Sequence, residues 1–145
     1  MEYKILNKNE IVLMKEITIE GFNQFKKESF EDFINTPNTY AFIAKNHNSV
    51  VGLCYGYVLK RPDREDFNFY IRSLGVLESF RKRGIGSALL EFVKSYAFEK
   101  LNCSECFLTT INDNGSACRL YEKHGGETYE KEIVYKFTKP AKLSG

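Results

Sequence analysis

The chain has 145 residues, of which 43% are hydrophobic and 28% charged, so it is neither disordered nor fibrous and we expect one globular domain over residues 1–145. The formal net charge of +2 is too small to predict binding to nucleic acid or to membranes. No apolar run approaches the roughly 20 residues that span a bilayer. The first residues lack the basic-then-apolar order of a signal peptide, and we expect a cytoplasmic protein.

The first half of the chain predicts two helices followed by three strands. Apolar spacing indicates an amphipathic helix over about residues 9–25, and a second short helix over 28–35 ends at a Thr-Pro-Asn break. Two strands, 40–44 and 50–59, are joined by a loop rich in turn-forming residues. A charged loop then leads to a third strand, 67–76, which is rich in aromatic and branched residues.

The second half predicts a long helix, a strand, a short helix and a last strand. One apolar stripe runs through residues 85–101, and a strand over 106–111 follows. A helix over 116–124 ends at two glycines, and we expect residues 128–137 to finish the sheet as a bent strand or a pair of strands. The order ααβββαβαβ predicts a mixed α/β (α+β) fold, a mostly antiparallel sheet flanked by helices.

Four cysteines raise the possibilities of a disulfide framework or a metal site. Cys54 and Cys118 lie in apolar or helical patterns, where an unpaired cysteine behaves as a small hydrophobic residue. Cys103 and Cys106 have CxxC spacing, but in a strand that began at Cys103 their thiols would point to opposite faces. Because there is no second CxxC and no histidine nearby, we expect no metal.

A strand, a basic turn and the start of a helix follow one another between residues 74 and 88. Unpaired amides at a helix N-terminus bind anions, because they lack intrahelical partners and the helix dipole is positive there. Gly84 and Gly86 open this helix, Ser87 adds a hydroxyl, and positive charge comes from Arg81, Lys82 and Arg83. The turn therefore predicts a diphosphate site. A P-loop would need a lysine after Gly86, and the Rossmann motif would need a small residue at Leu89.

Together with a second motif, this turn resembles the GNAT acetyltransferase superfamily over nearly the whole chain. Arg81-x-x-Gly84-x-Gly86 is similar to that family's Gln/Arg-x-x-Gly-x-Gly/Ala pyrophosphate loop. The second cofactor motif of the family is similar to Asn114-x-x-Ala117-x-x-Leu120-Tyr121. The resemblance implies an N-acetyltransferase that uses acetyl-CoA and transfers the acetyl group by direct attack of a primary amine in a ternary complex.

The resemblance also implies roles for individual residues. The pyrophosphate would be held by Arg81, Lys82, Arg83, Gly84, Ile85, Gly86 and Ser87. The strand segment Leu74, Gly75 and Val76 would splay from the next strand and pair with the pantetheine arm, which Asn114 would also contact. A backbone N–H near Val76 would polarise the thioester carbonyl, and Tyr121 would donate a proton to the departing thiolate.

Within the superfamily, the strand patterns are similar to those of aminoglycoside 3-N-acetyltransferases. Where those enzymes carry an aspartate before the Leu-x-Val segment, this chain has Ser73, which is a poor base, so we expect weak acetylation of aminoglycosides. Five other acidic residues could attract a cationic amine or relay its proton through water, but each is better explained as a solvated charge: Glu28, Glu31, Asp32, Glu65 and Asp66.

The expected partner is a small-molecule amine, aminoglycoside-like or polyamine-like. Three alternatives remain: a protein N-terminal or lysine acetyltransferase, a non-catalytic acyl-CoA-binding sensor, and a nucleic-acid-binding protein that uses the basic turn. The third is disfavoured because one short basic turn makes a small footprint. The general base and the formation of a homodimer are left open.

Overall fold

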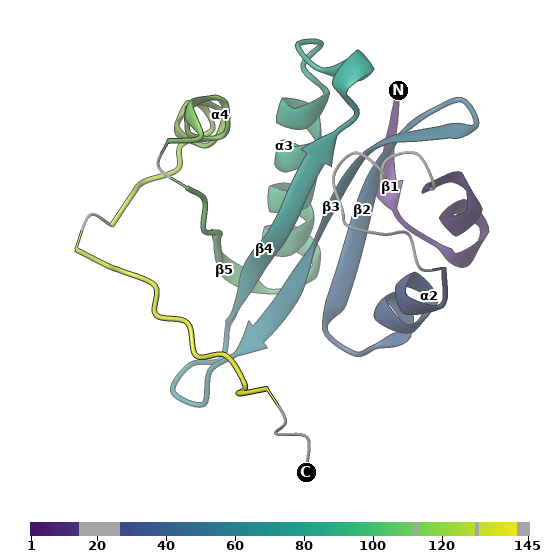
Figure 1. Cartoon of the computed structure of the whole chain (residues 1–145). Helices are drawn as coiled ribbons and strands as arrows, with labels where there is room; N and C mark the ends of the chain where they lie inside the picture. The colour runs from purple at the N-terminus through teal and green to yellow at the C-terminus, as the bar shows by residue number, and fades with distance from the viewer. Residues whose placement is uncertain (15–26, 112, 130, 142–145) are drawn as a thin grey trace.

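A five-stranded sheet forms the centre of the protein in the computed structural model, which describes residues 1–14, 27–111, 113–129 and 131–141 (Figure 1). The strands lie in the order in which they follow in the chain: β1 (Glu2–Ile5), β2 (Thr39–Asn46), β3 (Ser49–Lys60), β4 (Phe67–Val76) and β5 (Cys103–Phe107). The first three pairings are antiparallel and β5 runs parallel to β4. The expected mixed, mostly antiparallel sheet is confirmed.

Helices cover both faces of this sheet (Figure 1). The long helix α3 (Ile85–Lys100) lies on one face, and α2 (Lys27–Asn35) lies on the other with the 3₁₀ helix η1 (Lys8–Met14). Helix α4 (Gly115–Lys123) lies beyond β5, and a short 3₁₀ helix η2 (Glu78–Phe80) connects β4 to α3. No helix of the described residues is long and apolar enough to cross a membrane.

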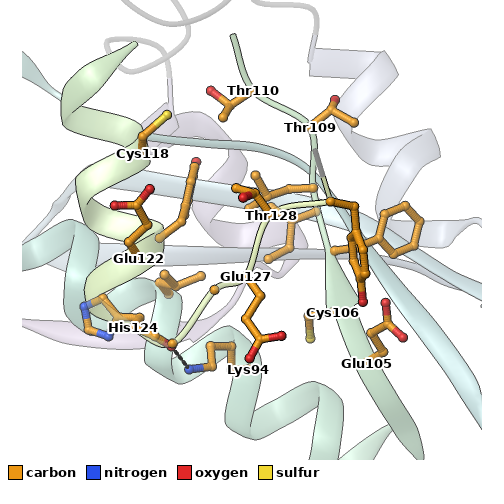
Figure 2. Close-up of a pocket in the computed structure, with 18 of the residues that line it drawn as sticks. Lys94, Glu105, Cys106, Thr109, Thr110, Cys118, Glu122, His124, Glu127 and Thr128 are labelled. Carbon is orange, nitrogen blue, oxygen red and sulfur yellow. Dashed lines mark hydrogen bonds between the residues drawn. The ribbon is translucent and has the colours of Figure 1, made fainter. Parts of the chain in front are cut away.

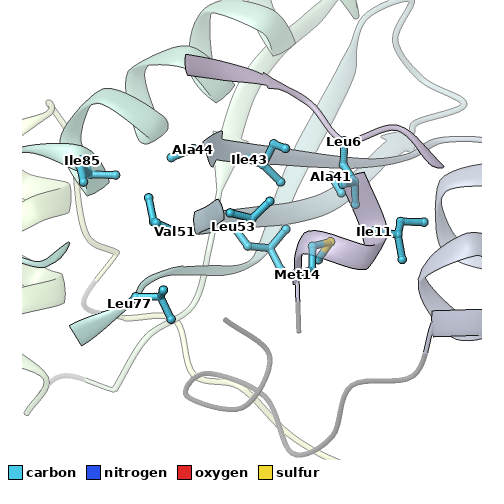
Figure 3. Close-up of a cluster of buried hydrophobic side chains, with 11 residues drawn as sticks. Leu6, Ile11, Met14, Ala41, Ile43, Ala44, Val51, Leu53, Leu77 and Ile85 are labelled. Atoms are coloured by element: carbon cyan, nitrogen blue, oxygen red, sulfur yellow. The ribbon is translucent and has the colours of Figure 1, made fainter. Parts of the chain in front are cut away.

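Two hydrophobic clusters form the core, one on each face. The cluster under η1 and α2 is shown in Figure 3 and consists of Leu6, Ile11, Met14, Ala41, Ile43, Ala44, Val50, Val51, Leu53, Leu77 and Ile85. The cluster under α3 consists of Phe42, Cys54, Val58, Phe69, Ile71, Leu89, Leu90, Val93, Ala97 and Cys103. Neighbours such as Phe42 and Ile43 belong to different clusters because successive side chains of a strand point to opposite faces.

Several elements follow the expectations from the sequence closely. The strand expected over 67–76 is β4, and the helix expected over 28–35 is α2, which starts one residue earlier. The apolar stripe over 85–101 forms α3, whose Leu89 and Val93 are fully buried. Helix α4 ends at Lys123, one residue before the expected end, and the expected glycine stop follows at Gly125, where a φ of 86° lets the chain turn in the left-handed region.

The expectation of an α-helix over 9–25 is wrong in its described part. Residues 8–14 form the 3₁₀ helix η1, in which Ile11 and Met14 are both fully buried. Residues three apart lie on the same face of a 3₁₀ helix, so this helix type lets Ile11 and Met14 both point into the core. Residues 15–25 of the expected helix lie outside the described residues. Strand β1, which pairs with β2, was not expected from the sequence.

The strand expected over 106–111 begins and ends earlier than predicted. Asn102 has a φ of 54°, and its carbonyl accepts a hydrogen bond from the N–H of Phe67 at 3.1 Å, which starts the parallel pairing at Cys103. The pairing ends with Tyr70 of β4 opposite Phe107, so residues 108–111 have no strand beside them among the described residues.

The expectation that residues 128–137 finish the sheet is also wrong. The described residues of this segment form no strand, and Figure 1 shows them running away from α4 outside the sheet. Val134 and Phe137 are 78% and 94% exposed. Alternating apolar residues give a segment β propensity, but strand pairing also needs a neighbouring backbone, which the local sequence does not supply.

A bulge in β4 lies opposite a glycine of β3. Tyr55 pairs with Ser73 and Gly56 pairs with Ile71, so Arg72 is an extra residue on β4. A Cβ atom on Gly56 would lie 2.0 Å from the Tyr70 carbonyl oxygen, so the two backbones approach too closely for any other residue. Bulges bend the strand and increase its twist. The bend comes just after Tyr70, where β4 leaves β5.

We expect Gly56→Ala to destabilise the protein by about 3 kcal/mol, because the added methyl group would push β4 away from β3. The matched control is Gly75→Ala in β4, where a Cβ atom meets nothing within 4 Å and stability should change by less than about 0.5 kcal/mol. Urea unfolding of both variants measures the difference. Equal stability of the two would contradict the close approach at Gly56.

Candidate active site

The sheet opens between β4 and β5. These strands pair only from Phe67 to Tyr70 on β4, and among the described residues no strand pairs with residues 71–76 on the β5 side. An unpaired strand edge offers N–H and C=O groups to any extended molecule that lies beside it. The splay that the family resemblance implied for Leu74, Gly75 and Val76 is therefore present in the structure.

The turn after β4 delivers the N-terminus of α3 to the same end of the opening. Lys82 and Gly84 have φ values of 63° and 80°, and Gly84 is the N-cap residue of α3. The first hydrogen bond of the helix runs from the Ala88 N–H to the Gly84 carbonyl at 3.0 Å. The amides of Ile85, Gly86 and Ser87 come before it and have no intrahelical acceptor. Nothing lies within 4 Å of the position that a Cβ on Gly84 would take.

The basic side chains of the turn make different contacts. The Nε of Arg81 donates to the Val76 carbonyl oxygen at 2.9 Å, which links the turn to the end of β4. The guanidinium of Arg83 lies 5.1 Å from the centre of the Phe80 ring, a cation–π contact. Together with the amides of α3, these exposed cations make an open, positive cradle that fits a diphosphate.

Tyr121 lies on α4, half-buried against the cluster under α3. Burial raises the pKa of its phenol, and the nearby thiols of Cys54 and Cys118 raise it further. The phenol therefore carries its proton at neutral pH and can donate it. Asn114 is the N-cap residue of the same helix, and its side-chain oxygen accepts a hydrogen bond from the Ala117 N–H at 3.4 Å.

A cavity of about 1060 Å³ lies between β5, α4 and the segment after Gly125. Figure 2 shows Cys118 and Glu122 of α4 on one side of it and Thr109 and Thr110, which follow β5, on another. Tyr121 and Ile71 also line it, so the space reaches the core beside the unpaired part of β4. The cavity is large enough for a small organic molecule.

A polar contact between α3 and α4 holds the helix that carries Tyr121. The Nδ1 of His124 lies 2.7 Å from the Glu91 carboxylate. The Lys94 ammonium donates to the His124 carbonyl oxygen at 2.9 Å, a hydrogen bond that Figure 2 shows. Hydrogen bonds lower the pKa of Glu91, the largest effect coming from Lys94 and the next from His124. This contact was not expected from the sequence, where His124 stood out only as a helix-end residue.

The cysteines are free thiols in the interior or at its border. Burial raises the pKa of Cys54 and of Cys106 to about 12, so both stay protonated and are poor nucleophiles. The expectation that Cys103 and Cys106 point to opposite faces of a strand is wrong. The pairing with β4 skips Ser104, and this bulge lets both thiols pack against the cluster under α3. Among the described residues, no three metal-ligating side chains lie together.

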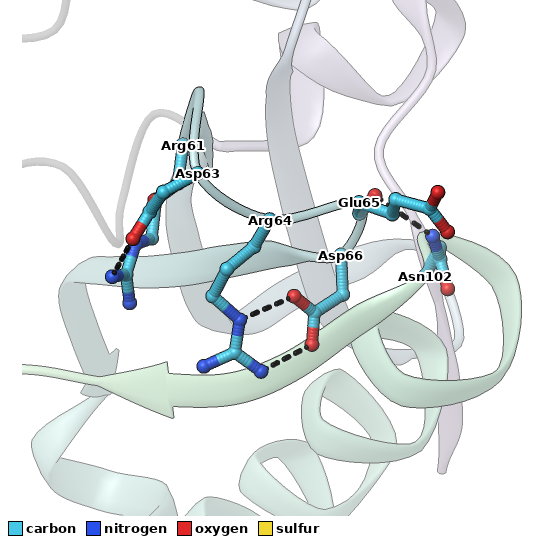
Figure 4. Close-up of polar contacts among 6 residues, drawn as sticks. All are labelled: Arg61, Asp63, Arg64, Glu65, Asp66 and Asn102. Atoms are coloured by element: carbon cyan, nitrogen blue, oxygen red, sulfur yellow. Dashed lines mark hydrogen bonds and ion pairs between the residues drawn. The ribbon is translucent and has the colours of Figure 1, made fainter.

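Two aspartates before β4, Asp63 and Asp66, are engaged in ion pairs. Figure 4 shows Arg64 in a two-point contact with Asp66, at 2.7 Å for both hydrogen bonds, and Arg61 in a similar contact with Asp63. A hydrogen bond from the Arg64 guanidinium, and to a lesser extent one from Ser104, lowers the pKa of Asp66 to about 2. Asp66 is thus a weak base, and it lies at the opposite end of β4 from Val76.

Ser73 lies opposite Tyr55 in the pairing of β3 with β4, just after the bulge. Burial raises the pKa of Tyr55, so this phenol is also protonated at neutral pH. Neither side chain is an ionised base under those conditions.

The structure brings the turn, the splayed strand and Tyr121 to one end of the sheet. The role of Gly56 was not expected from the sequence, although a glycine inside a strand pattern is a signal of a bulge.

Comparison with known proteins gives a family match. The model of the acetyltransferase (GNAT) family matches residues 11–126. An N-alpha-acetyltransferase 60 of Xenopus tropicalis is 27% identical over 136 residues, which cover 82% of this chain and 56% of that protein. The chain spans about half the length of the curated relatives it matches.

Solved structures share the fold. An aminoglycoside acetyltransferase from an uncultured soil metagenomic sample, in complex with sisomicin, has a TM-score of 0.80 at 22% identity, with 96% of each chain covered. An aminoglycoside N-acetyltransferase in complex with CoA has a TM-score of 0.78 at 18% identity, covering 94% of this chain and 93% of that chain. At such identities the likeness shows the fold alone.

The two-point contact with Arg64 should decide how Asp66 titrates. A lowered pKa in the folded protein means that the contact stabilises the fold above the ordinary pKa of 3.8 and loses its effect as the pH falls through about 2. In Arg64→Gln, NMR titration of the Asp66 carboxyl should show that its pKa rises from about 2 toward the ordinary 3.8, because the hydrogen bond to Ser104 remains. A pKa that stays near 2 in this variant would show that Arg64 is not the cause.

Proposed function

The chain belongs to the acetyltransferase (GNAT) family, and we propose that it transfers an acetyl group from acetyl-CoA to the primary amine of a small molecule. One observation carries the proposal: the unpaired part of β4 leads, through η2 and the basic turn, to a helix N-terminus whose first amides have no intrahelical acceptor and whose N-cap glycine is open. The first feature suits an extended amide-containing arm and the second suits a diphosphate, and acetyl-CoA joins both in one molecule.

The residues of the turn would hold the diphosphate. The amides of Ile85, Gly86 and Ser87 supply directed N–H donors, and Gly84 leaves the backbone uncovered. Lys82 and Arg83 would add positive charge, and Arg81 stands at the start of the turn. Backbone groups of Leu74 and Gly75 would pair with the arm, and the side-chain amide of Asn114 would contact it from α4.

At the reacting end, two groups of the chain would act. Bound acetyl-CoA supplies the activated acetyl thioester. The backbone N–H of Val76 would polarise the thioester carbonyl, as donors do in an oxyanion hole. Tyr121, which is protonated at neutral pH, would donate its proton to the departing thiolate. An ammonium has no lone pair, so the amine must lose a proton before it attacks, and water is the base that fits the absence of a carboxylate at Ser73.

The nature of the amine has two candidates. The resemblance to aminoglycoside 3-N-acetyltransferases supports an aminoglycoside-like or polyamine-like acceptor. Similarity to an N-alpha-acetyltransferase 60 over 82% of the chain supports a protein N-terminus as the second candidate. Because Ser73 replaces the expected aspartate, we place polyamine-like amines ahead of aminoglycosides among the small molecules.

We expect acetyl-CoA to stabilise the protein by about 2.7 kcal/mol at a hundredfold excess over its Kd, and ATP or NAD to do much less. Gly84→Ala should lower the affinity for CoA measured by calorimetry. Its matched control is Gly125→Ala, because Gly125 has a φ of 86° and an equally open Cβ position. Both variants should lose about 1 kcal/mol of stability from left-handed strain. Equal CoA affinity in both would refute the cradle at α3.

Transfer itself is tested with Tyr121→Phe, which keeps the ring and removes the donor. On the best acceptor of a panel of polyamines, aminoglycosides and short peptides, turnover measured by thiol release should fall by roughly 10² to 10⁴. The Kd for CoA should stay the same. Full activity of the variant would leave Tyr121 with a packing role, and failure of the wild type on every amine of the panel would speak against acetyl transfer.

A further inference from the structure

The peptide unit between Val76 and Leu77 is held at both of its polar groups. Its carbonyl oxygen, on Val76, accepts the hydrogen bond from the Arg81 Nε at 2.9 Å. Its N–H, on Leu77, donates to the Val51 carbonyl oxygen of β3 at 2.9 Å. A peptide group is planar, so a bond on each side fixes its rotation about the chain axis. Arg81 is thus one of two groups that orient the end of β4.

The Arg81 side chain reaches this carbonyl by folding back over η2. Its backbone N–H donates to the Glu78 carbonyl at 3.2 Å, and the N–H of Phe80 donates to the Leu77 carbonyl at 2.9 Å, so the turn between them is closed by backbone bonds. Arg83, two residues later, lies instead over the Phe80 ring. The two arginines of the turn therefore have different surroundings.

We propose that Arg81 is a positioning residue, which acts through Val76 and sets the direction of the backbone against which the thioester lies. The inference rests on the proposed function, because it is the Val76 N–H that we assign to the thioester carbonyl. That N–H lies in the preceding peptide unit, which is joined to the fixed unit through the Cα atom of Val76, so holding one unit restricts the direction of the other. Oxyanion donors work only when held within about 0.5 Å of the productive position. In this role Arg81 contributes the hydrogen-bond donor at its Nε, and its positive charge matters less than that donor.

Three substitutions separate the donor from the charge. Arg81→Gln keeps an N–H donor on Cδ, the same number of bonds from the backbone as the arginine Nε, but it removes the charge. Arg81→Lys keeps the charge and puts a methylene where the donor was. Arg81→Met has neither. The matched control is Arg83→Gln, which removes a charge from the same turn without touching Val76.

The first readout needs no cofactor. Amide hydrogen exchange of Leu77, followed by NMR in the free protein, reports how firmly its peptide unit is held. We expect exchange to become about tenfold faster in Arg81→Lys and Arg81→Met and to stay near the wild-type rate in Arg81→Gln and Arg83→Gln. The same exchange rate in all four variants would overturn the proposed role.

The second readout separates kcat from binding. With saturating acetyl-CoA, kcat should fall about tenfold or more in Arg81→Lys and Arg81→Met, whereas Arg81→Gln should keep most of the wild-type kcat. The Kd for CoA should instead depend on the charge at residue 81, so that it changes in Arg81→Gln and Arg81→Met more than in Arg81→Lys. Arg83→Gln should weaken CoA binding and leave the Leu77 exchange rate unchanged. If Arg81→Lys retained kcat while Arg81→Gln lost it, Arg81 would be a diphosphate ligand and the proposal would be wrong.

The two proposals fail in different ways. If the wild-type protein did not bind CoA by calorimetry, the proposed function would fall and the role of Arg81 at a thioester would fall with it. If CoA bound to the wild type but neither the Leu77 exchange rate nor kcat depended on an N–H donor at residue 81, the proposed function would stand and the positioning role would be refuted.

Discussion

The close approach of β3 and β4 at Gly56 is the constraint from which the site follows. Without a side chain there, the Tyr70 carbonyl can lie against the glycine, and β4 accommodates one extra residue at Arg72. The resulting bend comes where the hydrogen bonds to β5 end. A continuous ladder between β4 and β5 along residues 71–76 would leave no edge for a ligand, and the bulge at Arg72 follows directly on the last pairing, that of Tyr70 with Phe107.

The opening persists because the surrounding elements are held independently of it. Strands β2 and β3 carry a buried cluster on each face, so β4 is anchored along β3 even where β5 has left it. On the far side, His124 and Glu91 tie α4 to α3. A rigid frame on both sides of an unpaired edge is what a site needs if it is to bind an extended molecule without first rearranging.

The electrostatics of the described residues are compatible with the proposed chemistry at backbone groups and one phenol. Asp63 and Asp66, before the start of β4, are paired with arginines, and the pKa of Asp66 is lowered to about 2. Burial keeps the Cys54 and Cys106 thiols neutral. Exposed positive charge lies instead at the turn before α3, where the helix dipole adds to it. Direct acyl transfer requires an anion-binding site and hydrogen-bond donors but no enzyme nucleophile. The charged and protonated groups described above are distributed in a way that meets these requirements.

Local pattern alone was enough for α3, β4 and the glycine turn between them, because periodicity and helix-start signals act within a few residues. It was not enough for the start of β5, for strand β1, or for the segment 128–137, whose pairing depends on backbones distant in sequence. The family motif marked Arg81 and Tyr121, but the bond from Arg81 to Val76 and the bulge opposite Gly56 exist only once β3, β4 and the turn are packed together. Residue types and local elements were thus readable from the sequence, whereas the opening of the sheet was decided by contacts between strands.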